Sequence, residues 1–124
     1  MTPSIGWVAA VLVAVGLVAI GVAALFLPRT AASQYGIALD DPRAQALIRA
    51  MGIRDVAMGM LIALLAATSA REMLAWGMVA LGLVAVVDLV VVTNDRGGID
   101  RACLPHAAGA MALLLTGALL RAGL

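Results

Sequence analysis

Three ionisable residues, Arg54, Asp55 and Asp88, stand inside otherwise apolar stretches of this 124-residue chain. A carboxylic acid protonates a departing oxygen while a carboxylate activates water or takes a proton, and an arginine between the two holds their charges apart. Such a set suits the opening or rearrangement of an epoxide. We therefore predict that Asp55 and Asp88 form an acid–base pair and that Arg54 orients them.

Asp88 lies five residues before Thr93, at the end of its predicted helix, and hence about 7–8 Å below that end. A charged, unpaired aspartate at this depth costs a few kcal/mol, so Asp88 should be protonated, paired or in contact with a water-filled cavity. Arg54 is the expected partner, because it lies at a comparable depth on a neighbouring helix, and we expect it to bridge Asp88 and Asp55 of its own turn. The alternative is a buried structural ion network that locks two helices together.

Other polar side chains gather on the same predicted side of the bundle and are candidates for binding. They are Arg49, Asn94, His106, Gln45 and Tyr35. His106, at the start of the last predicted helix, is expected to serve as a hydrogen-bond acceptor or base, the alternative being an ordinary interfacial side chain. One His and one Cys with scattered Asp give no recognised ligand spacing, so we expect no metal and no other cofactor.

The composition places these residues in a membrane. Hydrophobic residues make up 65% of the chain and charged residues 12%, whereas soluble domains contain about 45–50% and about 25%. A body of this size buries only about two thirds of its surface, so the apolar excess cannot be hidden inside a soluble fold. These proportions exclude a soluble enzyme, and the net charge of +1 gives no field that would attract nucleic acid.

The chain contains four apolar stretches that are long enough to cross about 30 Å of hydrocarbon as helices. We expect a single membrane domain, residues 1–124, that folds as an all-α integral membrane four-helix bundle with antiparallel up-down topology. The predicted spans are about 5–27, 50–69, 73–93 and 103–121. Residues 28–49 should form a cytoplasmic loop and the start of the second helix, which begins at Pro42 behind the N-cap Asp41.

Two local features predict how the spans pack. Ser69 is expected to open a capping box for the third span, and the short turn there should make spans two and three antiparallel neighbours. Small residues are expected where helices approach closely in lipid. They are Ala19, Ala23, Gly52, Gly59, Gly77, Ala80, Gly109 and Gly117.

The arginines predict the orientation. The loops after the first and third spans hold most of them, and the opposite side holds only two. The first group is Arg29, Arg43, Arg49, Arg96 and Arg101, and the second is Arg71 and Arg121. Because basic loops stay in the cytoplasm, we expect a multi-pass protein of the cell membrane with both termini outside. Trp7 and Trp76, which begin two spans on that outer side, agree with this orientation.

The run R-A-M-G-I-R-D from Arg49 to Asp55, followed by Met58-Gly59, resembles a motif of small uncharacterised four-span membrane proteins of bacteria and fungi. These proteins form a domain-of-unknown-function family that is loosely similar to DoxX-type proteins. In that family a polar residue interrupts the third span, which here corresponds to Asp88 together with Asn94. The resemblance covers nearly the whole chain in layout and implies a four-span membrane fold, but it brings no established activity. Small multidrug transporters share the length, but their membrane carboxylate lies in the first span, which is uncharged here.

Three functions are compatible with these residues. The first is a membrane enzyme, a hydrolase or isomerase, that acts on a lipophilic small molecule in a polar pocket at the inner face. The second is an oligomeric small-molecule or proton-coupled transporter in which Asp88 titrates. The third is a non-catalytic subunit that assembles with another membrane protein. In each case the surrounding partner is the lipid bilayer, and we expect a homo-oligomer.

Overall fold

The chain is helical throughout the part that the structure describes. The computed structural model describes residues 4–34 and 40–124, apart from the side chains of residues 34, 95, 96 and 102. The helices are α1 (Ile5–Phe26), α2 (Pro28–Gln34), α3 (Pro42–Ala67), α4 (Arg71–Arg96) and α5 (Leu104–Ala122), with a 3-10 turn at Arg101–Cys103. Four of them, all except α2, are long and apolar enough to cross a membrane. This confirms the predicted all-α membrane bundle, whereas α2 lies in a segment that the sequence predicts as a loop.

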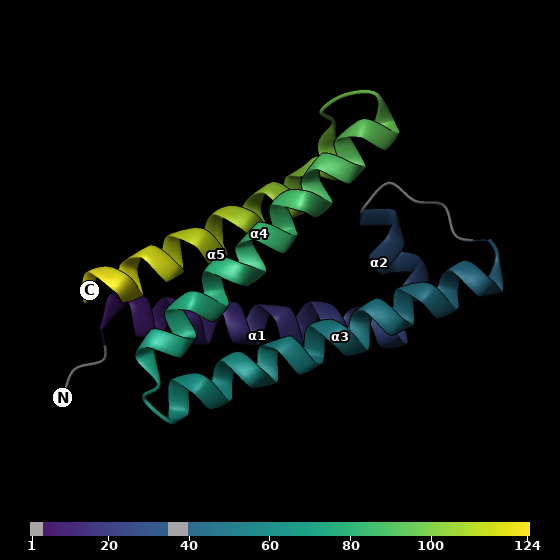
Figure 1. Cartoon of the computed structure of the whole chain (residues 1–124). Helices are drawn as coiled ribbons and strands as arrows, with labels where there is room; N and C mark the ends of the chain where they lie inside the picture. The colour runs from purple at the N-terminus through teal and green to yellow at the C-terminus, as the bar shows by residue number, and fades with distance from the viewer. Residues whose placement is uncertain (1–3, 35–39) are drawn as a thin grey trace.

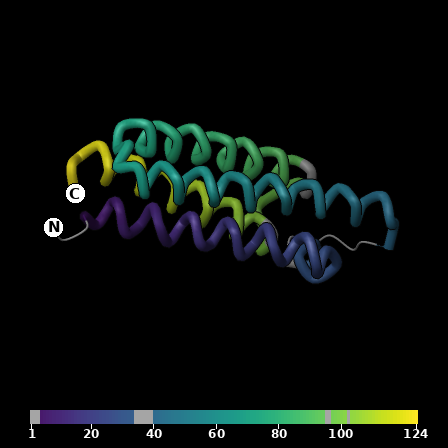
Figure 2. The backbone as a smooth tube through the Cα atoms, turned by 90° about the horizontal axis from the view of Figure 1, so that it is seen from below, coloured from purple at the N-terminus to yellow at the C-terminus, as the bar shows by residue number. Residues whose placement is uncertain are grey.

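The four long helices form two antiparallel pairs (Figure 1). α1 packs along α3, and α4 packs along α5. Viewed from below, the long helices all run along one common direction (Figure 2). The pairs meet at the end that holds the turn between α3 and α4 and the C-terminus, which we call the closed end. They separate toward the end that holds α2 and the turn between α4 and α5, which we call the open end.

α3 and α4 are in contact, as expected for antiparallel neighbours joined by a short turn, but α3 packs chiefly on α1 and contacts α4 far less. Glycines explain the choice of partner. A Cβ atom added to Gly52 would lie 2.7 Å from the carbonyl oxygen of Gly21, and one added to Gly59 would lie 2.7 Å from that of Ala14. Such close backbone approach favours helix association in lipid, so α1 is the main partner of α3.

The predicted small-residue contacts are confirmed only in part. Gly52, Gly59 and Gly117 lie at helix contacts. A Cβ atom added to Gly117 would lie 3.2 Å from a carbonyl oxygen of α4. The other predicted positions either are exposed or have no neighbouring atom within 4 Å of an added Cβ. The exposed positions are Ala19, Ala23 and Ala80, and the positions without a neighbouring atom are Gly77 and Gly109. Residue size alone does not predict which face of a helix meets a neighbour.

The core that both pairs share lies in the half of the bundle nearest the closed end. All four long helices contribute buried residues to it. They are Ala10, Ala14, Ile62, Ala66, Leu74, Ala75, Met78, Leu113 and Leu120. The amide of Gly6 also donates to the carbonyl of Leu124 at 3.0 Å, which joins α1 directly to the end of α5. The two pairs are therefore held together at one end.

Both tryptophans lie at the closed end, as the sequence predicts for residues on one side of a membrane. Trp7 donates its indole N–H to the carbonyl of Ala66 at 3.1 Å. The guanidinium of Arg121 lies 5.0 Å from the centre of the Trp76 ring and forms an ion pair with Glu72. Which side of the membrane this end faces stays a prediction.

The two predicted helix starts differ in outcome. Asp41 caps α3, and its carboxylate accepts the amide of Arg43 at 2.9 Å. The capping box at Ser69 is wrong, because Ala70 is the N-cap of α4 and makes no side-chain cap bond. Ser69 instead has a φ of 56°, and its backbone N–H donates to the carbonyl of Ala66. This left-handed residue ends α3. A turn this short uses Ser69 to finish one helix and not to begin the next.

Arg71 joins α4 to the end of α5, and its loss should weaken the fold. Its Nε donates to the carbonyl of Leu120 at 2.7 Å, one of the last carbonyls of α5. We expect Arg71→Met to lower the free energy of unfolding by about 1–2 kcal/mol, as measured by chemical denaturation in detergent micelles. Arg121→Met is the matched control, because the Arg121 ion pair is exposed and should contribute at most about 1 kcal/mol. An equal loss in both variants would contradict a specific role for the Leu120 hydrogen bond.

Candidate functional site

α3 positions Arg54 and Asp55 near the middle of its length. The Nε and Nη2 atoms of Arg54 both donate to Oδ1 of Asp55, each at 3.3 Å. Within the described part of the chain, no donor contacts Oδ2 of Asp55. The arginine therefore neutralises this carboxylate while one of its oxygens stays available to another molecule.

Asp88 occupies a corresponding place on α4, where it is partly buried. No described residue forms a hydrogen bond or ion pair with it. Every fully buried side-chain oxygen or nitrogen among the described residues has a hydrogen-bond partner. Because Asp88 has none among these residues, its oxygens are not fully buried. Asp88 thus presents an unpartnered carboxyl group to the surroundings of the bundle.

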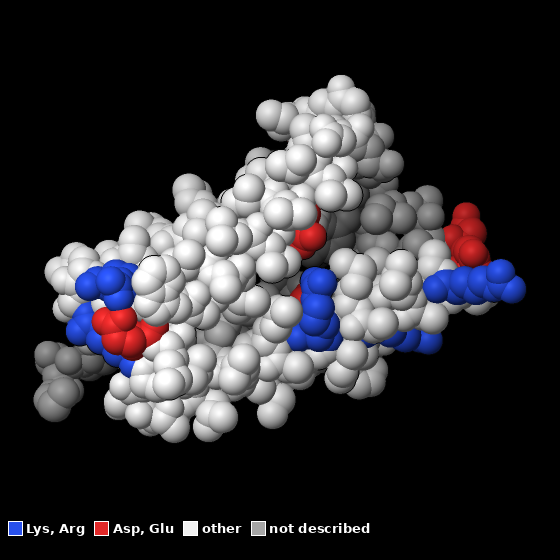
Figure 3. Space-filling view, in the orientation of Figure 1, with Lys and Arg blue, Asp and Glu red and all other residues white. Residues whose placement is uncertain are grey.

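Asp55 and Asp88 belong to different helix pairs, and the charge of Asp88 acts on Asp55 across the opening between the pairs. Figure 3 shows acidic and basic side chains on the two sides of the hollow between α4 and α3. The expected ion pair between Arg54 and Asp88 is not present, since the guanidinium binds Asp55 instead. The reason is the divergence of the two pairs, which leaves the carboxylate on its own helix as the nearer partner.

The residues predicted to bind ligand lie nearer the open end than the two aspartates do. On α3, Arg49 precedes Asp55 by six residues and Gln45 precedes it by ten, which is about 9 and 15 Å along the helix. On α4, Asn94 follows Asp88 by about 9 Å. His106 lies in the first turn of α5. Among the described residues, no hydrogen bond or ion pair joins any of these four to either aspartate, and Tyr35 lies outside the described residues.

One contact that the sequence did not predict ties α4 to α5 at the open end. The hydroxyl of Thr93 lies 3.5 Å from the sulfur of Cys103, which is buried and 3.8 Å from Oδ1 of Asp100. This contact depends on the path of the turn between the helices, and no spacing in the sequence signals it. It strengthens the pairing of α4 with α5 beside the opening.

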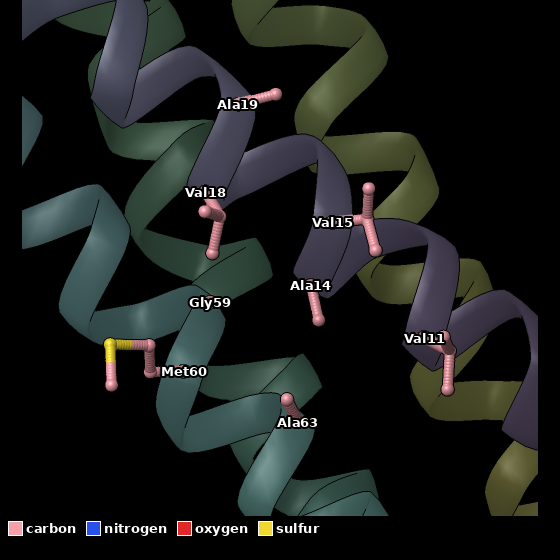
Figure 4. Close-up of a pocket in the computed structure, with 8 residues that line it drawn as sticks. All are labelled: Val11, Ala14, Val15, Val18, Ala19, Gly59, Met60 and Ala63. Carbon is pink, nitrogen blue, oxygen red and sulfur yellow. The ribbon is translucent and has the colours of Figure 1, made fainter.

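An apolar groove lies between α1 and α3, apart from the charged opening (Figure 4). Its volume is about 340 Å³. It is lined by Val11, Ala14, Val15, Val18 and Ala19 of α1 and by Gly59, Met60 and Ala63 of α3. No lining side chain carries a polar group, so the groove provides no acid or base.

The donor set of the opening fits proton transfer better than metal binding. Among the described residues, no three or more His, Cys, Asp and Glu side chains are grouped to hold a metal ion. Asp55 and Asp88 are accompanied by an arginine, whose positive charge opposes a bound cation. The absence of a cofactor stays a prediction.

The fold and the site together define a small helical membrane protein whose two helix pairs present one carboxyl group each to a common opening. The chain belongs to the family described as a domain of unknown function, DUF4267, which matches residues 5–120. This confirms membership of an uncharacterised family over nearly the whole chain. The likeness to DoxX-type proteins and the role of the R-x-x-G-x-R-D run stay predictions. No curated protein and no solved structure matches the chain.

Proposed function

We propose that this protein is a membrane enzyme that opens or isomerises an epoxide of a lipophilic small molecule in the opening between its two helix pairs. One observation carries the proposal: Asp55 and Asp88 lie on the two helix pairs that border the opening, and of these two aspartates only Asp55 has a cationic partner among the described residues. Ionisable groups at membrane depth are costly to keep, and for this reason they mark functional sites more often than chance.

The different surroundings of the two carboxyl groups suit them to different roles. Two carboxylates that face one another do not both ionise readily, so one tends to remain an acid while the other is a base. Arg54 donates two hydrogen bonds to one oxygen of Asp55 and so orients its carboxyl group. Asp88 has no such partner among the described residues. We therefore assign Asp88 as the acid, Asp55 as the base and Arg54 as the residue that orients Asp55.

In this arrangement, hydrolysis of the epoxide proceeds as follows. Asp88 donates its proton to the ring oxygen as the carbon–oxygen bond breaks, while a water molecule attacks the carbon and loses a proton to Asp55. The product is a diol, and a proton transfer from Asp55 to Asp88 restores the starting state. In isomerisation, Asp55 takes the proton from a carbon next to the ring, and the product is an unsaturated alcohol.

The test is an assay of the purified protein in lipid nanodiscs with limonene oxide and a long-chain terminal epoxide. We expect gas chromatography and mass spectrometry to detect a diol or an unsaturated alcohol, and the Asp55→Asn/Asp88→Asn double variant to form neither. Water labelled with heavy oxygen separates the two reactions, because only the diol incorporates the label. Failure to convert any lipid-soluble epoxide would contradict the proposal.

A proton-coupled carrier is the second candidate, because the unpartnered Asp88 is also suited to bind and release a proton. A carrier must open alternately to both sides of the membrane, however, and the shared core fills the closed end of this bundle. Proton-driven uptake of a lipophilic solute into liposomes that is lost in Asp88→Asn would favour the carrier over the enzyme.

A further inference from the structure

Each helix pair is built as a unit. In the first pair, the backbones of α1 and α3 touch at Gly21 and Gly52, so the two helices cannot slide without steric conflict. In the second pair, Gly82 of α4 lies against Leu114 of α5, and the contact between Thr93 and Cys103 joins the helices at the open end. Helices packed this closely move together, because packed interfaces resist continuous deformation.

The two units are joined chiefly toward the closed end within the described part of the chain. The core that they share draws all its buried residues from the half of the bundle nearest that end. The hydrogen bond from Gly6 to Leu124 and the short turn at Ser69 lie at the same end. Joined at one end and separated at the other (Figure 1), the units have the form of a hinge with the two aspartates between its arms.

The charges that face Asp88 come from one neighbouring element. α3 contributes Arg54 and Asp55, while α1 has no ionisable side chain. α5, which packs directly on α4, carries His106 in its first turn and Arg121 at the closed end. Since Arg54 is already bound to Asp55, a charge on Asp88 faces another carboxylate across the opening, and no described cation forms an ion pair with it.

We infer that the two helix pairs open and close about the closed end, and that ionisation of Asp88 opens them. With Asp88 neutral, the apolar faces of the two pairs approach each other and enclose the site. With Asp88 charged, repulsion from Asp55 and the demand of a carboxylate for water hold the pairs apart. The inference rests on the proposed function, since it describes how the same site admits a molecule and then encloses it.

Distance measurements between spin labels test this motion. The labels are placed on the exposed open-end positions Leu47→Cys of α3 and Val91→Cys of α4, in a Cys103→Ala background and in lipid nanodiscs. Pulsed electron paramagnetic resonance should give a longer mean distance at alkaline pH than at acidic pH. A matched pair at the closed end, Ile5→Cys of α1 and Met73→Cys of α4, should show no change.

Two variants connect the motion to the carboxyl groups. Asp88→Asn should keep the short distance at every pH, and Asp55→Asn should do the same because it removes the opposing charge. An open-end distance that does not change with pH would overturn the inference. A pH-dependent change that persists in Asp88→Asn would also overturn it, because the change would then arise from another group such as His106. The measurement needs no substrate, so its failure is distinct from a failure of the epoxide assay.

Discussion

Asp88→Asn should lower the rate of epoxide opening by about 100- to 10,000-fold, the usual contribution of a positioned general acid or base. The amide has nearly the shape of the carboxylic acid but donates no proton to the departing ring oxygen. Asp88 has no hydrogen bond or ion pair to lose among the described residues, so the fold should survive. Product formation in the nanodisc assay gives the rate, and circular dichroism with thermal unfolding reports on the fold.

Asp40→Asn is the matched control for that experiment. It makes the same chemical change at an exposed position just before α3, fifteen residues before Asp55, and should leave both the rate and the stability unchanged. If Asp88→Asn unfolded the protein while Asp40→Asn did not, Asp88 would belong to a structural ion network. That result would support the alternative interpretation of the charged cluster and would contradict the enzymatic one.

Gly52→Ala should lower the free energy of unfolding by about 1–3 kcal/mol, the usual cost of overpacking a tight contact. Its new methyl group would lie 2.7 Å from the carbonyl oxygen of Gly21 and 2.9 Å from the Cβ of Ala24. The first of these neighbours is backbone, so relief requires α1 and α3 to move apart. Because Gly52 lies three residues before Asp55, the same movement should shift the site and reduce turnover.

Gly16→Ala provides the control, because a Cβ on Gly16 of α1 meets no atom within 4 Å. This variant should leave the stability unchanged or raise it by up to about 1 kcal/mol, since alanine favours a helix over glycine. Thermal unfolding of both variants in the same detergent measures the difference. Equal stability in the two would show that the contact between α1 and α3 is looser than the structure indicates.

The sequence predicts the elements of this protein well, because each depends on local chemistry. An uninterrupted apolar run from Ile5 is long enough to span a bilayer whatever surrounds it, and α1 follows it closely. Asp41 before Pro42 predicts the start of α3, since a cap and a proline in the first turn act within a few residues. The tryptophans at one end follow from the alternation of the spans.

The partners of these elements are predicted less well, because pairing depends on surfaces far apart in the chain. The short turn after Ala67 predicts α4 as the neighbour of α3, but the glycines at 21, 52 and 59 make α1 the better fit. The contacts predicted within the site are affected for the same reason. The sequence predicts that Arg54 bridges Asp55 of its own turn and Asp88 on an adjacent helix, yet the pairs diverge and Arg54 binds Asp55 alone among the described carboxylates. Residue types in the sequence identify the three groups, but not which two of them pair.

Cysteine accessibility measures most directly whether Asp88 faces an opening. In a Cys103→Ala background, Asp88→Cys and Val87→Cys lie at nearly the same depth on α4, and Val87 is 60% exposed on an outward face. A charged, membrane-impermeant thiol reagent added to vesicles from both sides should modify the cysteine at position 88 rapidly and the one at 87 very slowly. Protection of position 88 by a lipophilic epoxide would add support. If the reagent modified neither position, or both at one rate, Asp88 would not face a separate opening, and the proposed site would have no basis.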